Sequence, residues 1–323
     1  MSGVWKLKLR SWFIMVVMFA LVYFIIMIAG NLLGLGGFYG FYFITGIVVL
    51  ILQYLFGPSI VKRSMGVREL SEAEAPHIHQ MVEELAMAAN IPKPKVGISP
   101  TTVPNAFAYG RTKRSGHVCV TQGILNTLNR DELKAVLGHE ISHIKHNDMA
   151  ITTIVSAIPL VCYYIGMSFI FSGRGDNNNN GAIIGILAMC AYFVGQLLVL
   201  FLSRVREYYA DEGSVSLGCK PEHLASALYK LVYGAAVAPE QEIKDIEGTK
   251  AFFVTNITDA RKEFNSLSQL DLNHDGVIDA DEMALLREGK VDIDTRSKFM
   301  EILSTHPDTV SYTHLTLPTM AVV

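Results

Sequence analysis

Long apolar stretches alternate with polar segments along this chain. Residues 11–61, 149–173 and 177–203 contain no acidic, basic or histidine side chain. A transmembrane helix needs about 20 predominantly apolar residues, so the first stretch is long enough for two helices joined by a turn at residues 31–37. The pattern therefore predicts four transmembrane helices arranged as two hairpins. Buried core helices of a soluble protein are the alternative, which runs of this length disfavour.

Basic residues gather at one end of these predicted helices. The positive-inside rule makes that side cytoplasmic. We therefore expect a multi-pass protein of the cell or inner membrane whose soluble segments face the cytoplasm. The basic residues are Lys6, Lys8 and Arg10 before the first helix, Lys62, Arg63 and Arg68 after the second, and Arg204 and Arg206 after the fourth.

The segments outside the predicted membrane helices have the pattern of a mixed α+β domain. Ser71 and Glu74 form a capping-box pattern that predicts a helix reaching about Asn90, where a proline follows. Asn129 and Glu132 predict the start of a second helix in the same way. The expected strands are residues 95–98, 106–109 and 117–121, and further helices are expected at residues 204–218 and 223–233.

Composition limits the classes of function. Half of the residues are hydrophobic and 18% are charged, which fits a chain with membrane-spanning helices. The formal net charge of −3 gives no basic footprint of the kind that nucleic-acid binding needs. The 4 cysteines show no paired spacing, which favours a reduced cytoplasmic setting over a disulfide framework.

The chemistry of the chain is indicated by the sequence His-Glu-Ile-Ser-His at residues 139–143. On a helix, positions i and i+4 share a face, so His139 and His143 direct two imidazoles to one point, with Glu140 beside them. Two imidazole ligands and a carboxylate acting as general base are the arrangement of zinc peptidases. His146 could share the face of His143, but a fourth protein ligand would close the position that water needs, so we interpret it as an interfacial histidine.

A catalytic zinc site needs a third protein ligand, and the best candidate is Glu207. Glu207 and Asp211 are four residues apart, so on a helix one could bind the metal while the other accepts a hydrogen bond from a ligating histidine. A solvated helix in which Arg204 and Arg206 pair with these carboxylates is the alternative.

The predicted hairpin at residues 149–203 favours Glu207 as a metal ligand over the solvated-helix alternative. His143 lies six residues before this hairpin and Glu207 lies four residues after it, which correspond to roughly 9 and 6 Å of helix. Because both ends of a hairpin lie on the same face of a membrane, we expect the two ligand-bearing helices to lie side by side near the cytoplasmic surface.

Together these features resemble the HtpX-type membrane zinc metalloproteases, in the gluzincin group that also contains the CAAX prenyl protease. The resemblance implies that Glu207 is the third zinc ligand and that Asp211 is the hydrogen-bond partner of His139. It also implies that the substrates are membrane or membrane-proximal proteins and that the role is protein quality control. The similar segments are the N-terminal hairpin and residues 105–110, 139–143, 203–211 and 304–307.

The resemblance further implies which residues contact the substrate. An edge strand at residues 105–109 would pair with the substrate backbone, a common mode of peptide recognition. His306 would donate a hydrogen bond to the oxyanion formed at the scissile carbonyl; a surface or packing histidine is the alternative. The expected substrate-binding residues are Asn105, Ala106, Phe107, Ala108 and Tyr109.

A second metal site is predicted at residues 271–282. This segment fits the twelve-residue EF-hand loop, with Gly276 at the sharp turn, and short helices are expected on both sides. We expect it to bind one calcium ion; an acidic, turn-rich loop that stays empty is the alternative. The expected ligands are Asp271, Asn273, Asp275, Val277 through its backbone carbonyl, Asp279 and Glu282.

The last residues depart from the pattern of the resembling family, which continues after His-Pro with a polar helix. Residues 310–319 can be encoded by a transposase-adapter sequence used in library preparation, so we expect residues 310–323 to be artefactual. The expected organisation is a cytoplasmic N-terminus at 1–10, membrane hairpins at 11–61 and 149–203, peptidase segments at 62–148, 204–264 and 301–309, and the EF-hand-like insertion at 265–300.

The fold class expected is a multi-pass α-helical membrane protein, with four transmembrane helices and a mixed α+β zincin-like metalloprotease domain. The function expected is zinc-dependent endopeptidase activity. Two alternatives stay open, namely a calcium-responsive membrane scaffold with an inactive protease fold and a CAAX-type processing protease. The presence of His139, Glu140, His143 and Glu207 argues against an inactive fold.

Overall fold

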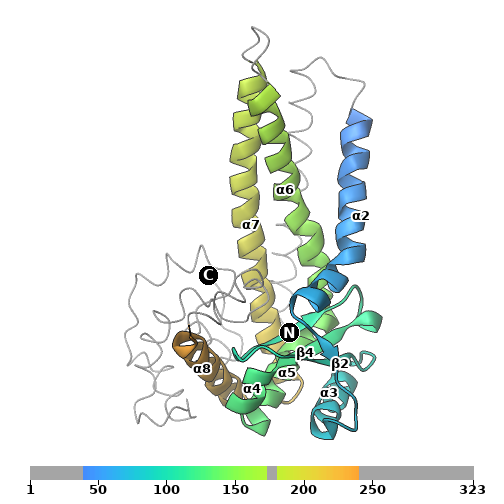
Figure 1. Cartoon of the computed structure of the whole chain (residues 1–323), viewed down its shortest axis with the longest axis vertical. Coiled ribbons are helices and arrows are strands. Elements are labelled where there is room, and N and C mark those ends of the chain that lie inside the picture. Colours follow the sequence, from blue (N-terminus) through green and yellow to red (C-terminus); the bar gives the residue numbers. More distant parts are fainter. Residues whose placement is uncertain (1–38, 173–179, 240–323) are drawn as a thin grey trace. The chain divides into compact units, whose positions relative to one another are not determined.

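The computed structural model describes residues 39–172 and 180–239 of the chain (Figure 1). The chain divides into two compact units. Of the described residues, 39–57, 150–172 and 180–205 form one unit, and 58–149 and 206–239 form the other. The predicted first membrane helix, the EF-hand-like loop, His306 and the tail at 310–323 all lie outside the described residues.

The second unit contains a four-stranded sheet in the order β1-β2-β4-β3. The central strands β2 (Lys95–Ser99) and β4 (His117–Thr121) pair in parallel, and β3 (Ala106–Tyr109) pairs antiparallel with β4 at one edge. These three strands confirm the predicted ones to within a residue. The other edge strand, β1 (Arg68–Glu69), was not predicted, because two residues are too few to show an alternating pattern.

Helices α3 (Pro76–Ala89), α5 (Arg130–His146) and α8 (Pro221–Val237) pack with this sheet around one apolar core. The short α4 (Gln122–Thr127) follows β4 directly. The buried side chains of α3 recur at helical spacing, so its apolar face is the face that meets the core. The largest fully buried side chains include Ile78, Met81 and Leu85 on α3 and Leu137 and Ile141 on α5.

The predicted start of α3 was wrong by four residues, since the N-cap is Ala75 and not Ser71. Ser71 and Glu74 do exchange the hydrogen bonds of a capping box, at 2.9 Å from Ser71 N to Glu74 Oε2 and 3.4 Å from Glu74 N to Ser71 Oγ. These bonds close a turn, and the helix begins at Pro76, whose fixed φ suits the first helical position.

The start of α5 is fixed by Glu132, which has two functions. Its Oε2 atom accepts a hydrogen bond from Asn129 N at 2.9 Å, completing the predicted capping box. Its Oε1 atom accepts from Ser226 Oγ and Lys230 Nζ on α8, each at 2.7 Å. Burial alone would raise the pKa of Glu132, but these hydrogen bonds outweigh burial and hold the pKa below its ordinary value.

Replacement of Glu132 by alanine should therefore destabilise the protein by about 3 kcal/mol, since it removes the cap and leaves Lys230 without its carboxylate. The melting temperature in detergent should fall by roughly 5–10 °C. Glu84→Ala is the matched control, because Glu84 pairs with Lys134 at the same 2.7 Å but on the surface. Its effect should stay below about 1 kcal/mol; equal losses in both variants would contradict this role for Glu132.

Three long helices contribute to the first unit, namely α2 (Tyr39–Ser64), α6 (Asp148–Ser172) and α7 (Asn180–Ser216). Figure 1 shows α6 and α7 side by side, and small or apolar residues fill their contact. Within the described part of the chain, Asp148–Met167 and Ile183–Ser216 are long and apolar enough to cross a membrane. Helix α2 corresponds to the second of the two helices predicted for the first hairpin.

The helix expected at residues 204–218 is present as far as Ser216, and it is continuous with the predicted fourth membrane helix. Helix α7 continues without interruption to Ser216, and Gly218 then adopts a φ of +93° that ends it. Nothing in the sequence between Ser203 and Ser216 breaks a helix, because this segment has neither proline nor a turn-forming pair.

Candidate metal centre

Helix α5 carries the His-Glu-x-x-His motif on its buried side. His139 and Glu140 are each 3% exposed, and His143 is half-buried. The C-terminal part of α7 carries Glu207 and Asp211, which are also buried. A solvated helix, the alternative considered for Glu207, is therefore excluded.

Small residues let these two helical segments approach closely. A side-chain methyl group at Gly213 would overlap the hydroxyl of Ser142, and one at Gly138 would lie 2.9 Å from Ser214 Oγ. Ser214 Oγ in turn donates a hydrogen bond to the carbonyl of Ala135 at 2.7 Å. Close packing of the backbones brings the side chains of His139, His143 and Glu207 within reach of one point.

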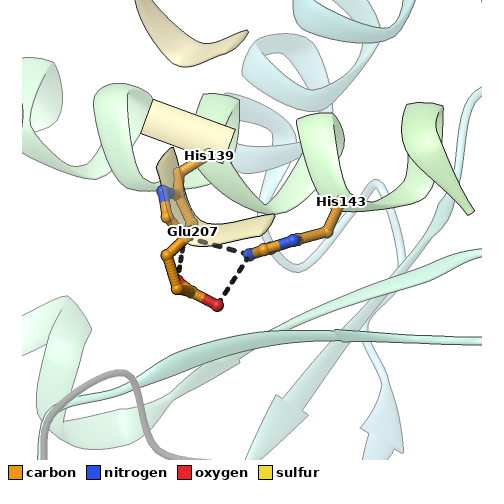
Figure 2. A group of neighbouring side chains, drawn as sticks. All are labelled: His139, His143 and Glu207. Atoms are coloured by element: carbon orange, nitrogen blue, oxygen red, sulfur yellow. Dashed lines mark hydrogen bonds and ion pairs between the residues drawn. The ribbon is translucent and has the colours of Figure 1, made fainter. Parts of the chain in front are cut away.

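Figure 2 shows the Glu207 carboxylate facing the two imidazoles. The Nε2 atoms of His139 and His143 are 3.1 Å apart. Glu207 Oε2 lies 3.3 Å from His139 Nε2, and Glu207 Oε1 lies 3.8 Å from His143 Nε2. The three groups each offer a ligand atom, and these atoms all lie within 4.8 Å of one another.

Both imidazoles use their other nitrogen to hold a carboxylate. The Nδ1–H group of His139 donates to Asp211 Oδ1 at 2.9 Å, and that of His143 donates to Asp148 Oδ2 at 2.8 Å. With the proton on Nδ1, each Nε2 presents a lone pair toward the other ring and toward Glu207. Three electron-pair donors that converge in this way form a site for a cation.

The geometry fits zinc. Tetrahedral zinc binds imidazole nitrogen at about 2.0–2.1 Å, which places neighbouring ligand atoms roughly 3.3 Å apart. The observed distances are close to this value: 3.1 Å between the two Nε2 atoms, and 3.3 and 3.8 Å from them to the Glu207 oxygens. Two histidines, one carboxylate and one open position are the ligand set of a catalytic zinc site.

The pKa values of the two histidines shift in opposite directions. Burial alone would lower the pKa of His139, but its hydrogen bonds to Asp211 and Glu207 outweigh burial and raise the pKa well above its ordinary value. For His143, burial dominates and lowers the pKa.

Glu140 is placed as a buried carboxylate beside the two imidazoles. Burial raises its pKa, while the neighbouring imidazoles and a backbone hydrogen bond from Ala108 act in the opposite direction. A raised carboxyl pKa suits a group that must both accept and return a proton near neutral pH.

The strand expected to bind substrate lies next to this carboxylate. Within the described sheet β3 pairs with β4 and forms an edge, and Asn105 directly precedes it. Phe107 and Tyr109 enter one apolar cluster, whereas Ala106 and Ala108 pack into the core that contains α5. The strand thus contacts α5, and none of the described strands pairs with its outer edge.

Two residues of this site, Asp148 and Arg206, were not predicted from the sequence. Asp148 was expected to be the last residue of the first peptidase segment, and Arg206 to be a basic residue that follows the fourth membrane helix. In the structure Arg206 forms a buried ion pair with Asp148, which holds His143. His146 is not a member of the group whose ligand atoms converge. Its Nδ1 atom lies 3.3 Å from Ser142 Oγ, and burial lowers its pKa to about 4.

Seven predicted site residues lie outside the described residues, so the structure places neither the oxyanion donor nor the calcium loop. They are His306, Asp271, Asn273, Asp275, Val277, Asp279 and Glu282.

Comparisons with known proteins agree on one family. Residues 72–311 match the sequence profile of peptidase family M48. The protease HtpX homolog of Methanothermobacter thermautotrophicus is 60% identical over 228 residues, which cover 71% of this chain and 86% of that protein. The HtpX homolog of Moorella thermoacetica is 39% identical over 222 residues, covering 65% of this chain and 74% of that protein.

Among solved structures, the crystal structure of S. mikatae Ste24p is similar in fold. Its TM-score is 0.50 at 15% sequence identity, and the match covers 98% of this chain and 67% of Ste24p. At this identity the similarity concerns the fold.

Proposed function

The chain belongs to peptidase family M48 and is a metalloprotease of the HtpX type, and on this basis we propose that it hydrolyses peptide bonds with one zinc ion held by His139, His143 and Glu207. The observation that carries the proposal is the convergence of three ligand atoms within 4.8 Å, with the carboxylate of Glu140 buried beside them. When bound there, zinc acidifies a water molecule and polarises the scissile carbonyl.

The residues of the chain supply the rest of the chemistry. Glu140 takes a proton from the attacking water and returns it to the leaving amine. Asp211 keeps the Nδ1 proton of His139 in place, so that Nε2 stays available to the metal. His306 is our candidate for a hydrogen-bond donor to the oxyanion, and the support for it is the His-Pro pair in the sequence.

We propose that the substrate backbone adds to the outer edge of β3. An extended peptide there would form main-chain hydrogen bonds with residues 105–109. The hydrogen bond from Ala108 to Glu140 ties this strand to the general base, so a paired peptide would lie beside the carboxylate that activates water. Positioning of this kind brings the reactants together before the chemical step.

A membrane location is the next part of the proposal. Helices α6 and α7 contain two candidate spans, and large apolar side chains on α7 such as Ile186 and Phe193 are 59% and 64% exposed. Apolar surface of this extent is typical of contact with lipid or protein. We propose a multi-pass protein with four spans, a cytoplasmic peptidase unit, and membrane or membrane-proximal substrates in protein quality control. Processing of CAAX-type proteins is the alternative substrate class.

The proposed activity is tested with purified full-length protein in detergent, casein as substrate and 1,10-phenanthroline as chelator. Casein cleavage should stop when the chelator removes the metal, and it should return when one equivalent of zinc is added. Cleavage that survives complete removal of zinc would contradict the assignment. An inactive scaffold would show zinc binding without cleavage of any substrate.

We also propose that residues 271–282 bind one calcium ion. The support is the loop sequence, which places oxygen ligands at positions 1, 3, 5, 9 and 12 and Gly276 at the turn. Terbium luminescence should report one site per chain, and Glu282→Gln should abolish it while the zinc content stays the same. If the Glu282→Gln variant binds terbium as the parent does, the proposed calcium site is wrong.

A further inference from the structure

The imidazole of His143 is held by a carboxylate that is not part of the zinc-binding motif. Its Nδ1–H group donates to Asp148 Oδ2 at 2.8 Å. The second oxygen of Asp148 forms an ion pair with the guanidinium of Arg206, which also donates to the backbone carbonyl of His146 at 3.3 Å. The side chains of Asp148 and Arg206 are only 6% and 7% exposed, so both charges are buried.

The backbone between α5 and α6 is shaped to place this carboxylate. Asn147 caps α5 with a φ of +56°, a left-handed conformation that asparagine tolerates better than most residues. The next residue, Asp148, is the first of α6. Because Asn147 interrupts the helix between His146 and Asp148, Asp148 is not a continuation of α5, and its side chain meets the ring of His143.

Arg206 balances the charge of this arrangement. Glu140, Glu207, Asp211 and Asp148 bring four buried carboxylates to the site. A divalent cation neutralises only part of that charge, and buried unpaired charges are costly. The guanidinium of Arg206 therefore offsets the charge of the carboxylate that contacts His143.

We propose that Asp148 is a positioning residue of the metal site and that Arg206 acts through it. Asp148 fixes the Nδ1-protonated tautomer and the orientation of His143, as Asp211 does for His139, so that both Nε2 atoms meet the same metal. This inference deepens the proposed function and rests on zinc binding by His139, His143 and Glu207. An ion pair that only connects α6 to α7 is the competing explanation.

The test compares zinc affinity with the stability of the metal-free protein, using full-length chain in detergent. Asp148→Asn keeps the shape and removes the charge, so it should weaken zinc binding by roughly 10- to 100-fold, as Asp211→Asn should also do. It should also lower the melting temperature of the metal-free protein, because Arg206 is then buried without its partner. Zinc affinity is measured by competition with a chromophoric chelator.

The double variant Asp148→Asn/Arg206→Gln separates the two explanations. It removes both charges, so its metal-free melting temperature should recover, while its zinc affinity should stay as low as that of Asp148→Asn. Recovery of parental zinc affinity together with stability would overturn the inference, as would normal affinity in Asp148→Asn. If Asp148→Asn does not fold, the double variant alone decides. Failure of the parent chain to bind zinc would instead overturn the proposed site and this inference together.

Discussion

Glu140→Gln should lower the rate of peptide hydrolysis by roughly 100- to 10,000-fold, which is the range that a general base contributes. The amide keeps the shape of the side chain but cannot take a proton from water. Because Glu140 does not belong to the three groups whose ligand atoms converge, zinc content should remain at the parental value. The measurements are initial rates of casein cleavage and zinc per chain by mass spectrometry.

The control for this prediction is Glu140→Asp, which keeps a carboxylate but withdraws it by one methylene group. This variant should retain more activity than the glutamine variant. Glutamine and aspartate variants of equal activity would show that the proton-accepting group lies elsewhere. Loss of zinc from either variant would place Glu140 among the ligands instead.

Glu207→Ala should remove most of the bound zinc. Glu207 supplies one of three protein ligand atoms, so its loss should weaken zinc binding by more than the roughly 10- to 100-fold expected for a residue that acts through a ligand. Activity should fall in parallel at limiting zinc and recover in part at high zinc. Equilibrium dialysis against buffered zinc measures the affinity.

Glu212→Gln is the matched control, because Glu212 lies on the same helix but is exposed to solvent. Its zinc affinity and activity should equal those of the parent. If the Glu207 and Glu212 variants behave alike, the carboxylate at residue 207 is not a metal ligand.

The local features of the site could be predicted from the sequence because they depend on short-range geometry. The spacing of His139 and His143 places both rings on one face of any helix, and the structure does bring them together. Strands β2, β3 and β4 were predicted because turn residues bound each of them. The capping box at Asn129 and Glu132 could be predicted for the same reason.

Long-range features could not be predicted in this way. Spacing alone did not decide whether Glu207 is a metal ligand or a solvated residue, because its role depends on which helix packs against it. Asp148 and Arg206 are far apart in sequence. Each lies beside a predicted membrane helix, where a charged residue is expected without any role in the site. The box at Ser71 and Glu74 formed its hydrogen bonds without starting a helix, since the proline at residue 76 sets that position.

X-ray absorption at the zinc edge tests the proposed site most directly. The zinc-loaded chain should show nitrogen and oxygen ligands at roughly 2.0–2.2 Å, with the scattering of two imidazoles. A third imidazole would implicate His146, and a ligand at roughly 2.3 Å would indicate a cysteine thiolate, of which the buried Cys119 is a candidate. Either result would contradict the assignment of His139, His143 and Glu207 as the protein ligands.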